Sequence, residues 1–223
     1  MNRFSAIILG AGSGDRMGGI DKILTEIAGL PSILHSVNTF LEVGRFETTI
    51  VLANTENVGQ LKYLTSGPEY QSVEVVLGGI RRQDSVKIGL GQIKSSDFVM
   101  IHDGARPCVS SALIRRAITE SENTDAAIPV VPINDTVKMV EASVVTSTVD
   151  RSSLYASQTP QVFRYKTISE LHRKLTFEVT DDASVAEIYG VEVSTFEGDP
   201  ENIKMTTPLD MEIAEIILKR RNT

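Results

Sequence analysis

The sequence predicts an α/β protein with a mainly parallel sheet, helices on both faces, and an inserted β-hairpin arm at about residues 134–151. Short apolar runs alternate with segments of helical length, which is the pattern of parallel βαβ units. The alternation stops after Pro132, where two β-type runs follow each other, and then resumes to the C-terminus. Residues 1–223 are therefore expected to form one domain that carries an arm.

The expected strands are short apolar runs bounded by turn residues, too short for core helices. They span residues 6–9, 48–52, 73–77, 98–101, 126–131, 161–163 and 191–196. The expected helices span residues 32–41, 55–64, a segment starting near 85, 111–120, 165–175, 182–189 and 208–220. Pro31 precedes the first helix and basic residues end the last one, and both positions are favourable.

The arm consists of two β-type runs, residues 137–140 and 144–149, joined by residues 141–143. This pattern indicates a hairpin. An isolated two-stranded hairpin is only marginally stable in water, so we expect the arm to pack against a second copy of the chain, giving a homodimer.

Composition limits the classes of function. The apolar content of 41% is ordinary for a protein with a packed core, and the net charge of −7 argues against general nucleic-acid binding. No apolar run approaches the roughly 18 residues of a membrane span, and no signal-peptide pattern precedes the first strand. The single cysteine, Cys108, excludes an internal disulfide framework and fits a reducing cytoplasm.

The first expected strand leads into a loop with five glycines between residues 10 and 19, accompanied by Arg16 and Lys22. Glycines let a backbone approach a ligand closely, and exposed N–H groups with nearby cations suit a polyphosphate. A Rossmann fingerprint from Gly10 fails because position 15 is Asp15, and a Walker A loop fails because position 20 is Ile20. An ordinary glycine-rich turn stays possible, although it has no need for two cations.

Polar residues and glycines follow successive expected strands, at Gly10, Gly78, His102-Asp103 and Asn134-Asp135. In parallel sheets ligands bind beyond the carboxyl ends of the strands, so these residues are expected along one edge of the sheet. Each group also has a simpler interpretation. Ser85 could be simply the N-cap of a helix, and Asp103 and Arg106 could form an internal ion pair. Lys204 and the charges of the arm could be solvated surface groups.

Other chemistries fit poorly. The three histidines lack metal-ligand spacing, one cysteine cannot hold zinc, and no G-x-S-x-G elbow is present. Cys108 follows a proline and is interpreted as buried. Asp181 and Asp182 could be a catalytic carboxylate pair, but a helix start is the favoured interpretation.

Taken together, the motifs resemble the 2-C-methyl-D-erythritol 4-phosphate cytidylyltransferase family from end to end. The motifs are GAGSGDRM (10–17) with Lys22, GGIRRQDSV (78–86), HDGARP (102–107), DTVK (135–138), QTPQVF (158–163), TDDAS (180–184) and NIKMTTPLD (202–210). The resemblance implies a Rossmann-like nucleotidyltransferase fold, a homodimer joined by hairpin arms, and transfer of CMP from CTP to a sugar-alcohol phosphate with Mg²⁺.

The resemblance also implies roles for matching residues. Arg16 and Lys22 would stabilise charge on the CTP phosphates, and Arg151 and Lys204 would position the sugar-alcohol phosphate. The residues implied to contact CTP are Ala11, Gly12, Ser13, Gly14, Gly79, Ser85 and Gly104. Those implied to contact the second substrate are Asp103, Arg106, Thr136 and Thr159. No ligands are assigned to the metal.

The predicted chemistry needs no general base, because a phosphate monoester is already largely dianionic at neutral pH. In-line positioning and charge neutralisation are what such a site must supply. Three alternatives stay open at this point: a ribitol-5-phosphate cytidylyltransferase, a sugar-1-phosphate nucleotidyltransferase, which the DTVK–Arg151 arm disfavours, and a non-catalytic nucleotide sensor.

Overall fold

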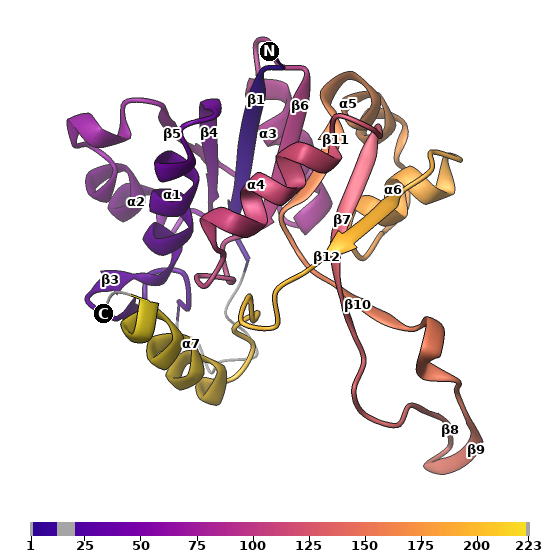
Figure 1. Ribbon diagram of the computed structural model, residues 1–223. Coiled ribbons are helices and arrows are strands. Elements are labelled where there is room, and N and C mark those ends of the chain that lie inside the picture. The colour runs from indigo at the N-terminus through magenta and orange to yellow at the C-terminus, as the bar shows by residue number, and fades with distance from the viewer. Residues whose placement is uncertain (1, 13–20, 222–223) are drawn as a thin grey trace.

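The computed structural model describes residues 2–12 and 21–221 and shows a mixed, mostly parallel sheet between two layers of helices (Figure 1). The strands follow the order β10-β7-β11-β6-β1-β4-β5, and β12 also pairs with β7. Their bounds are β1 Phe4–Gly10, β4 Phe46–Ala53, β5 Val73–Leu77, β6 Phe98–Asp103, β7 Ala126–Pro132, β10 Tyr155–Ser157, β11 Gln161–Arg164 and β12 Ser194–Glu197. The predicted α/β class is confirmed.

The helices lie on both faces of the sheet because its central strands, β1 and β6, are buried on both sides. In β1, Ala6 and Ile8 belong to one core cluster and Ile7 to the other, as alternating side chains require. One cluster includes residues of α1 and α4, and the other includes residues of α3, α5 and α6. The helix bounds are α1 Ser32–Val43, α2 Val58–Leu64, α3 Arg82–Gln92, α4 Ser111–Glu120, α5 Tyr165–Lys174, α6 Asp182–Ile188 and α7 Pro208–Arg221.

Three features differ from the sequence-based expectations. Strands β10 and β11 run antiparallel to their neighbours, and the small pair β2 (Glu26–Ile27) and β3 (Leu30–Pro31) had not been expected. Helix α3 begins before Ser85, because the Asp84 carboxylate accepts a hydrogen bond from the Arg81 N–H at 3.3 Å and caps the first turn. Ser85 is therefore not the N-cap, and its hydroxyl is available for another role.

The arm leaves the sheet after β7 and forms the hairpin β8 (Lys138–Glu141) and β9 (Val144–Thr148), which projects away from the helices and the main sheet (Figure 1). Every residue of the two strands is exposed. The short 3₁₀ helix η3 (Arg151–Ser153) leads back to β10. Among the described residues, no helix has the length and apolar character that a membrane span requires.

Candidate active site

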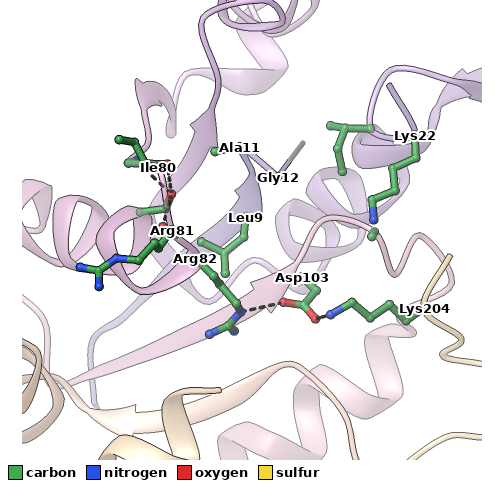
Figure 2. A pocket seen from close by; sticks show the side chains of 13 residues that line it. Leu9, Ala11, Gly12, Lys22, Ile80, Arg81, Arg82, Asp103 and Lys204 are labelled. Carbon is green, nitrogen blue, oxygen red and sulfur yellow. Dashed lines mark hydrogen bonds and ion pairs between the residues drawn. The ribbon is translucent and has the colours of Figure 1, made fainter. Parts of the chain in front are cut away.

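Two adjoining cavities open at the carboxyl end of β1 and β6, and both are lined by Arg82, Asp103 and Lys204. The first has a volume of about 280 Å³ (Figure 2). Its lining comprises Leu9, Ala11, Gly12, Lys22, Ile23, Gly79, Ile80, Arg81, Arg82, Ser85, Asp103, Ala105 and Lys204. The second, of about 270 Å³, is lined by Arg82, Asp103, Arg106, Ser157, Gln158, Thr159, Gln161, Thr180, Asp181 and Lys204. The predicted gathering of strand ends is thus observed for β1, β5 and β6.

Asp103 occupies the junction of the two cavities and holds two cations. Its Oδ2 lies 2.7 Å from Nζ of Lys204, and its Oδ1 lies 3.3 Å from Nε of Arg82 (Figure 2). Burial alone would raise the pKa of this carboxyl, but Arg82 and Lys204 outweigh burial and hold its pKa well below the usual range. The junction therefore keeps one carboxylate anion between two cations at neutral pH.

The turn between β5 and α3 brings backbone close to this cavity. A Cβ atom on Gly78 would lie 2.7 Å from Cβ of Ala11, and one on Gly79 would lie 2.4 Å from Cβ of Asp84. Only glycine fits such approaches. The Ser85 hydroxyl accepts a hydrogen bond from the Gly79 N–H at 3.0 Å. Ser85 therefore holds the glycine turn at the cavity wall.

A buried chain of hydrogen bonds holds the backbone of Asp103 in place. The Asp103 N–H donates to the Thr159 hydroxyl at 3.0 Å, and this hydroxyl lies 3.0 Å from Nδ1 of His102. Nε2 of His102 lies 3.2 Å from the Arg106 carbonyl, which can only accept, so Nε2 carries the proton and Nδ1 accepts from Thr159. Thr159 thus orders the end of β6 as well as lining the second cavity.

Burial of His102 predicts a pH-dependent stability. Burial lowers its pKa to about 4, against about 6.5 in the unfolded chain. Between these values the unfolded state binds the extra proton, so stability rises with pH and falls on acidification. We expect the free energy of unfolding to drop by roughly 2 kcal/mol between pH 7 and about pH 4.5 because of His102.

Urea unfolding at both pH values measures this dependence. The His102→Gln variant should lose about that part of the pH dependence, whereas His35→Gln, at a half-buried position outside both cavities, should keep it. An unchanged pH dependence in His102→Gln would contradict the role given to His102.

Arg106 combines two roles. Its Nη1 donates to the Asn202 carbonyl at 2.7 Å and its Nη2 to the Ser157 carbonyl at 3.4 Å, which ties the loop before α7 to β10. Nε of Arg106 lies 4.0 Å from Oδ2 of Asp103, so the ion pair considered as an alternative interpretation is long. The same residue lines the second cavity. Arg106 therefore shapes this cavity and adds positive charge to it.

The sequence-predicted site residues fall into four groups. Those lining the two cavities are Ala11, Gly12, Lys22, Gly79, Ser85, Asp103, Arg106, Thr159 and Lys204. Gly104 lies behind the wall, where a Cβ atom would approach the Leu9 carbonyl to 2.8 Å. Thr136 and Arg151 are exposed at the base of the arm, outside both cavities of this chain. Ser13, Gly14 and Arg16 lie outside the described residues.

Arg82 is absent from the sequence-based set although it lines both cavities. It was visible within GGIRRQDSV, but nothing in the sequence distinguished it from Arg81. In the structure, Arg81 pairs with Asp84 at 2.8 Å at the helix start. Arg82 instead turns toward Asp103 (Figure 2) and also pairs with Asp182. The favoured cap at the start of α6 is confirmed, since Oδ1 of Asp181 accepts from the Ser184 N–H at 2.9 Å.

Other sequence-based interpretations can be compared with the structure. Cys108 is buried, as expected, and burial raises the pKa of its thiol to about 11. Within the described part of the chain, no group of three or more His, Cys, Asp or Glu side chains is placed to hold a metal ion. Lys204, whose interpretation as a solvated lysine had been open, is paired with Asp103.

Comparison with known proteins gives the family to which the sequence is similar. Residues 4–220 match the family model described as 2-C-methyl-D-erythritol 4-phosphate cytidylyltransferase. The chain is 40% identical to the protein of that name from Shouchella clausii, over 98% of this chain and 97% of the relative. The Geobacillus thermodenitrificans protein is also 40% identical, over 98% of both chains.

A solved structure shows the same fold over its whole length. The 4-diphosphocytidyl-2C-methyl-D-erythritol synthase from Anaerococcus prevotii superposes with a TM-score of 0.86 at 29% identity, covering 98% of this chain and 99% of that one. The bifunctional IspDF from Campylobacter jejuni superposes with a TM-score of 0.82 at 25% identity, and this chain covers 54% of that longer protein.

Proposed function

The chain belongs to the 2-C-methyl-D-erythritol 4-phosphate cytidylyltransferase family, and we propose that its two adjoining cavities are where it transfers the cytidylyl group of CTP to that substrate. The observation that carries this assignment is the junction at Asp103. Two cavities share one carboxylate and the cations Arg82 and Lys204. Such a junction suits two phosphate-bearing substrates that must meet.

The reaction joins the phosphate oxygen of methylerythritol phosphate to the α-phosphorus of CTP, and the bond from that phosphorus to the β-phosphate bridging oxygen breaks. The products are CDP-methylerythritol and pyrophosphate. The attacking phosphate is already anionic at neutral pH, so no base is needed. The protein must align the two phosphates and offset their charge repulsion.

The first cavity fits the nucleotide. The backbone of Ala11 and Gly12 and the glycine turn of Gly79 form its wall, and the Lys22 side chain extends into the same space (Figure 2). The second cavity fits the polyol phosphate, because hydroxyl, amide and guanidinium groups line it, among them Thr159, Gln158 and Arg106. The α-phosphate would lie at the junction, within reach of Arg82 and Lys204.

Magnesium belongs to this proposal as a companion of the triphosphate. Asp103 is the only carboxylate among the described residues that line the first cavity, and Mg²⁺ commonly uses one or two carboxylates together with substrate phosphates. The absence of a larger acidic cluster in the described chain suits an ion held mainly by the nucleotide. Asp103 would hold it, and the ion would supply positive charge near the phosphates.

Pyrophosphate release tests the proposed function. CTP and Mg²⁺ are supplied with methylerythritol phosphate or, in parallel, with ribitol 5-phosphate. We expect release with methylerythritol phosphate, none after chelation of Mg²⁺ with EDTA, and little with ribitol phosphate. Faster release with ribitol phosphate would make that compound the substrate, and release with neither would favour a nucleotide sensor.

The homodimer is proposed on the exposed apolar surface of the arm. Met139, Val140, Val144 and Val145 are each more than half exposed, between 52% and 65%. Apolar surface concentrated on one projecting hairpin is typical of an interaction site. Packing against a second copy would cover it and could bring Thr136 and Arg151 to the partner's cavities.

We also propose a cytoplasmic location, which the single cysteine supports.

Charge on the arm should disrupt this dimer. Val140 and Val145 are paired across the hairpin, so the double variant Val140→Glu/Val145→Glu places two like charges on one face, whereas Val140→Thr/Val145→Thr preserves shape and strand propensity. Light scattering should show a mass near twice 24.3 kDa for the wild type, about half that mass for the Glu variant, and a dimer for the Thr variant. A monomeric wild type would refute the arm's role.

A further inference from the structure

A buried ion-pair chain leads from Arg82 into the interior of the protein. Nη1 of Arg82 lies 2.8 Å from Oδ2 of Asp182, and Oδ1 of Asp182 lies 3.0 Å from Nε2 of His172. The three side chains come from α3, α6 and α5. The Asp182 and His172 side chains are each 1% exposed, whereas that of Arg82 is 27% exposed.

The direction of the contacts is fixed by chemistry. The Asp182 carboxylate accepts, so Nε2 of His172 carries a proton, and Nδ1 has no hydrogen-bond partner among the described residues. Burial would raise the pKa of Asp182, but Arg82 and the His172 donor outweigh it and lower this pKa. A buried anion thus faces one guanidinium and one imidazole N–H.

Asp182 and His172 line neither cavity as formed by the described residues, whereas Arg82 lines both. Any effect of the buried pair on substrates must therefore pass through Arg82. A free arginine side chain samples many rotamers in solution. Anchoring its guanidinium to Asp182 on one side and Asp103 on the other removes this freedom before substrate arrives, which is the condition for preorganised charge.

We propose that Asp182, oriented by His172, is a positioning residue that holds the Arg82 guanidinium at the junction of the two cavities. This inference rests on the proposed function for its substrates. It explains why the second carboxylate of the Asp181-Asp182 pair is buried although Asp181 alone caps α6. A carboxylate with only a capping role would not need the Arg82 contact.

A double-mutant cycle tests the proposal, with the turnover number and KM for pyrophosphate release measured for wild type, Asp182→Asn, Arg82→Ala and the combination. We expect Asp182→Asn to lower the turnover number about tenfold in the wild-type background and less than twofold in Arg82→Ala, because the pair acts as one unit. Equal effects in both backgrounds would overturn the positioning role. Ser184→Ala, which removes the hydroxyl that donates to the Asp181 carboxylate and leaves Asp182 in place, should keep wild-type turnover.

Two further measurements keep the outcome clear. The affinity for inorganic pyrophosphate, measured by calorimetry, requires no turnover. We expect Asp182→Asn to weaken this binding in the wild-type background and to leave it nearly unchanged in Arg82→Ala. An inactive wild type would refute the proposed function, whereas the binding measurement would still test the positioning role of Asp182. If Asp182→Asn does not fold, His172→Gln and His172→Phe replace it. Gln keeps a donor for Asp182 and should stay within about threefold of wild type, whereas Phe should approach the tenfold loss. Equal activity in the Gln and Phe variants would contradict the role of His172 in orienting Asp182.

Discussion

Replacing Lys22 with alanine should lower the turnover number by about 10²–10³ while the protein stays folded, because preorganised charge near transferring phosphates is typically worth that much. Lys22 extends from the segment after the glycine-rich loop into the first cavity, where it faces the region of the Asp103–Lys204 pair (Figure 2). The measurement is steady-state pyrophosphate release, with the thermal unfolding midpoint as the check on folding.

The matched control for this variant is Lys62→Ala. Lys62 lies on the exposed surface of α2, outside both cavities, so the same change of charge should leave turnover near the wild-type value. Lys22→Arg keeps the charge but alters its geometry and should fall between the two. Turnover of Lys22→Ala within threefold of wild type would remove this lysine from the catalytic machinery.

Replacing Lys204 with methionine should also lower kcat/KM for methylerythritol phosphate by about 10²–10³, with little change in stability. The ammonium group faces Asp103 at 2.7 Å at the junction, but the side chain is 41% exposed. Partly exposed ion pairs contribute little to folding, whereas a cation placed between two phosphates supports the transition state directly. Methionine keeps the apolar stem, so packing is preserved.

Separate values of KM and the turnover number distinguish two explanations for a loss of activity in Lys204→Met. If Lys204 only recruits the sugar-alcohol phosphate, its KM should rise while the turnover number stays constant. A role at the reacting phosphates lowers the turnover number even at saturating substrate, and this is the expected result. Lys219→Met, on the exposed end of α7, is the control. A loss of activity in this control equal to that in Lys204→Met would point to a nonspecific charge effect.

The sequence predicted the part of the site that depends on local patterns and on the rules of parallel sheets. Gly10, Gly78 and Asp103 each follow an apolar strand, and the carboxyl ends of parallel neighbours meet at one edge. Helix α4 spans residues 111–120 as expected because its start is marked by Ser110, whose hydroxyl accepts from the Leu113 N–H.

What the sequence could not predict depends on contacts between distant segments. Asp103 and Lys204 form an ion pair although about half of the sequence separates them. Arg82 pairs with Asp182, which is one of 29 acidic residues in the sequence. No local pattern encodes such a choice, which burial and geometry decide. The direction of β11 could not be predicted either. This strand runs antiparallel to β6, but its short apolar run fits a parallel or an antiparallel strand equally well.

A crystal structure of the protein with Mg²⁺ and a CTP analogue that carries a methylene bridge between the α- and β-phosphorus atoms tests the central claim most directly. We predict that the triphosphate lies in the first cavity, against the backbone of Ala11 and Gly12 and beside Lys22, with its α-phosphate near Arg82 and Lys204. Binding in the cavity between α1 and α7, which Asn38 and Ser111 line, would contradict the assignment of the active site.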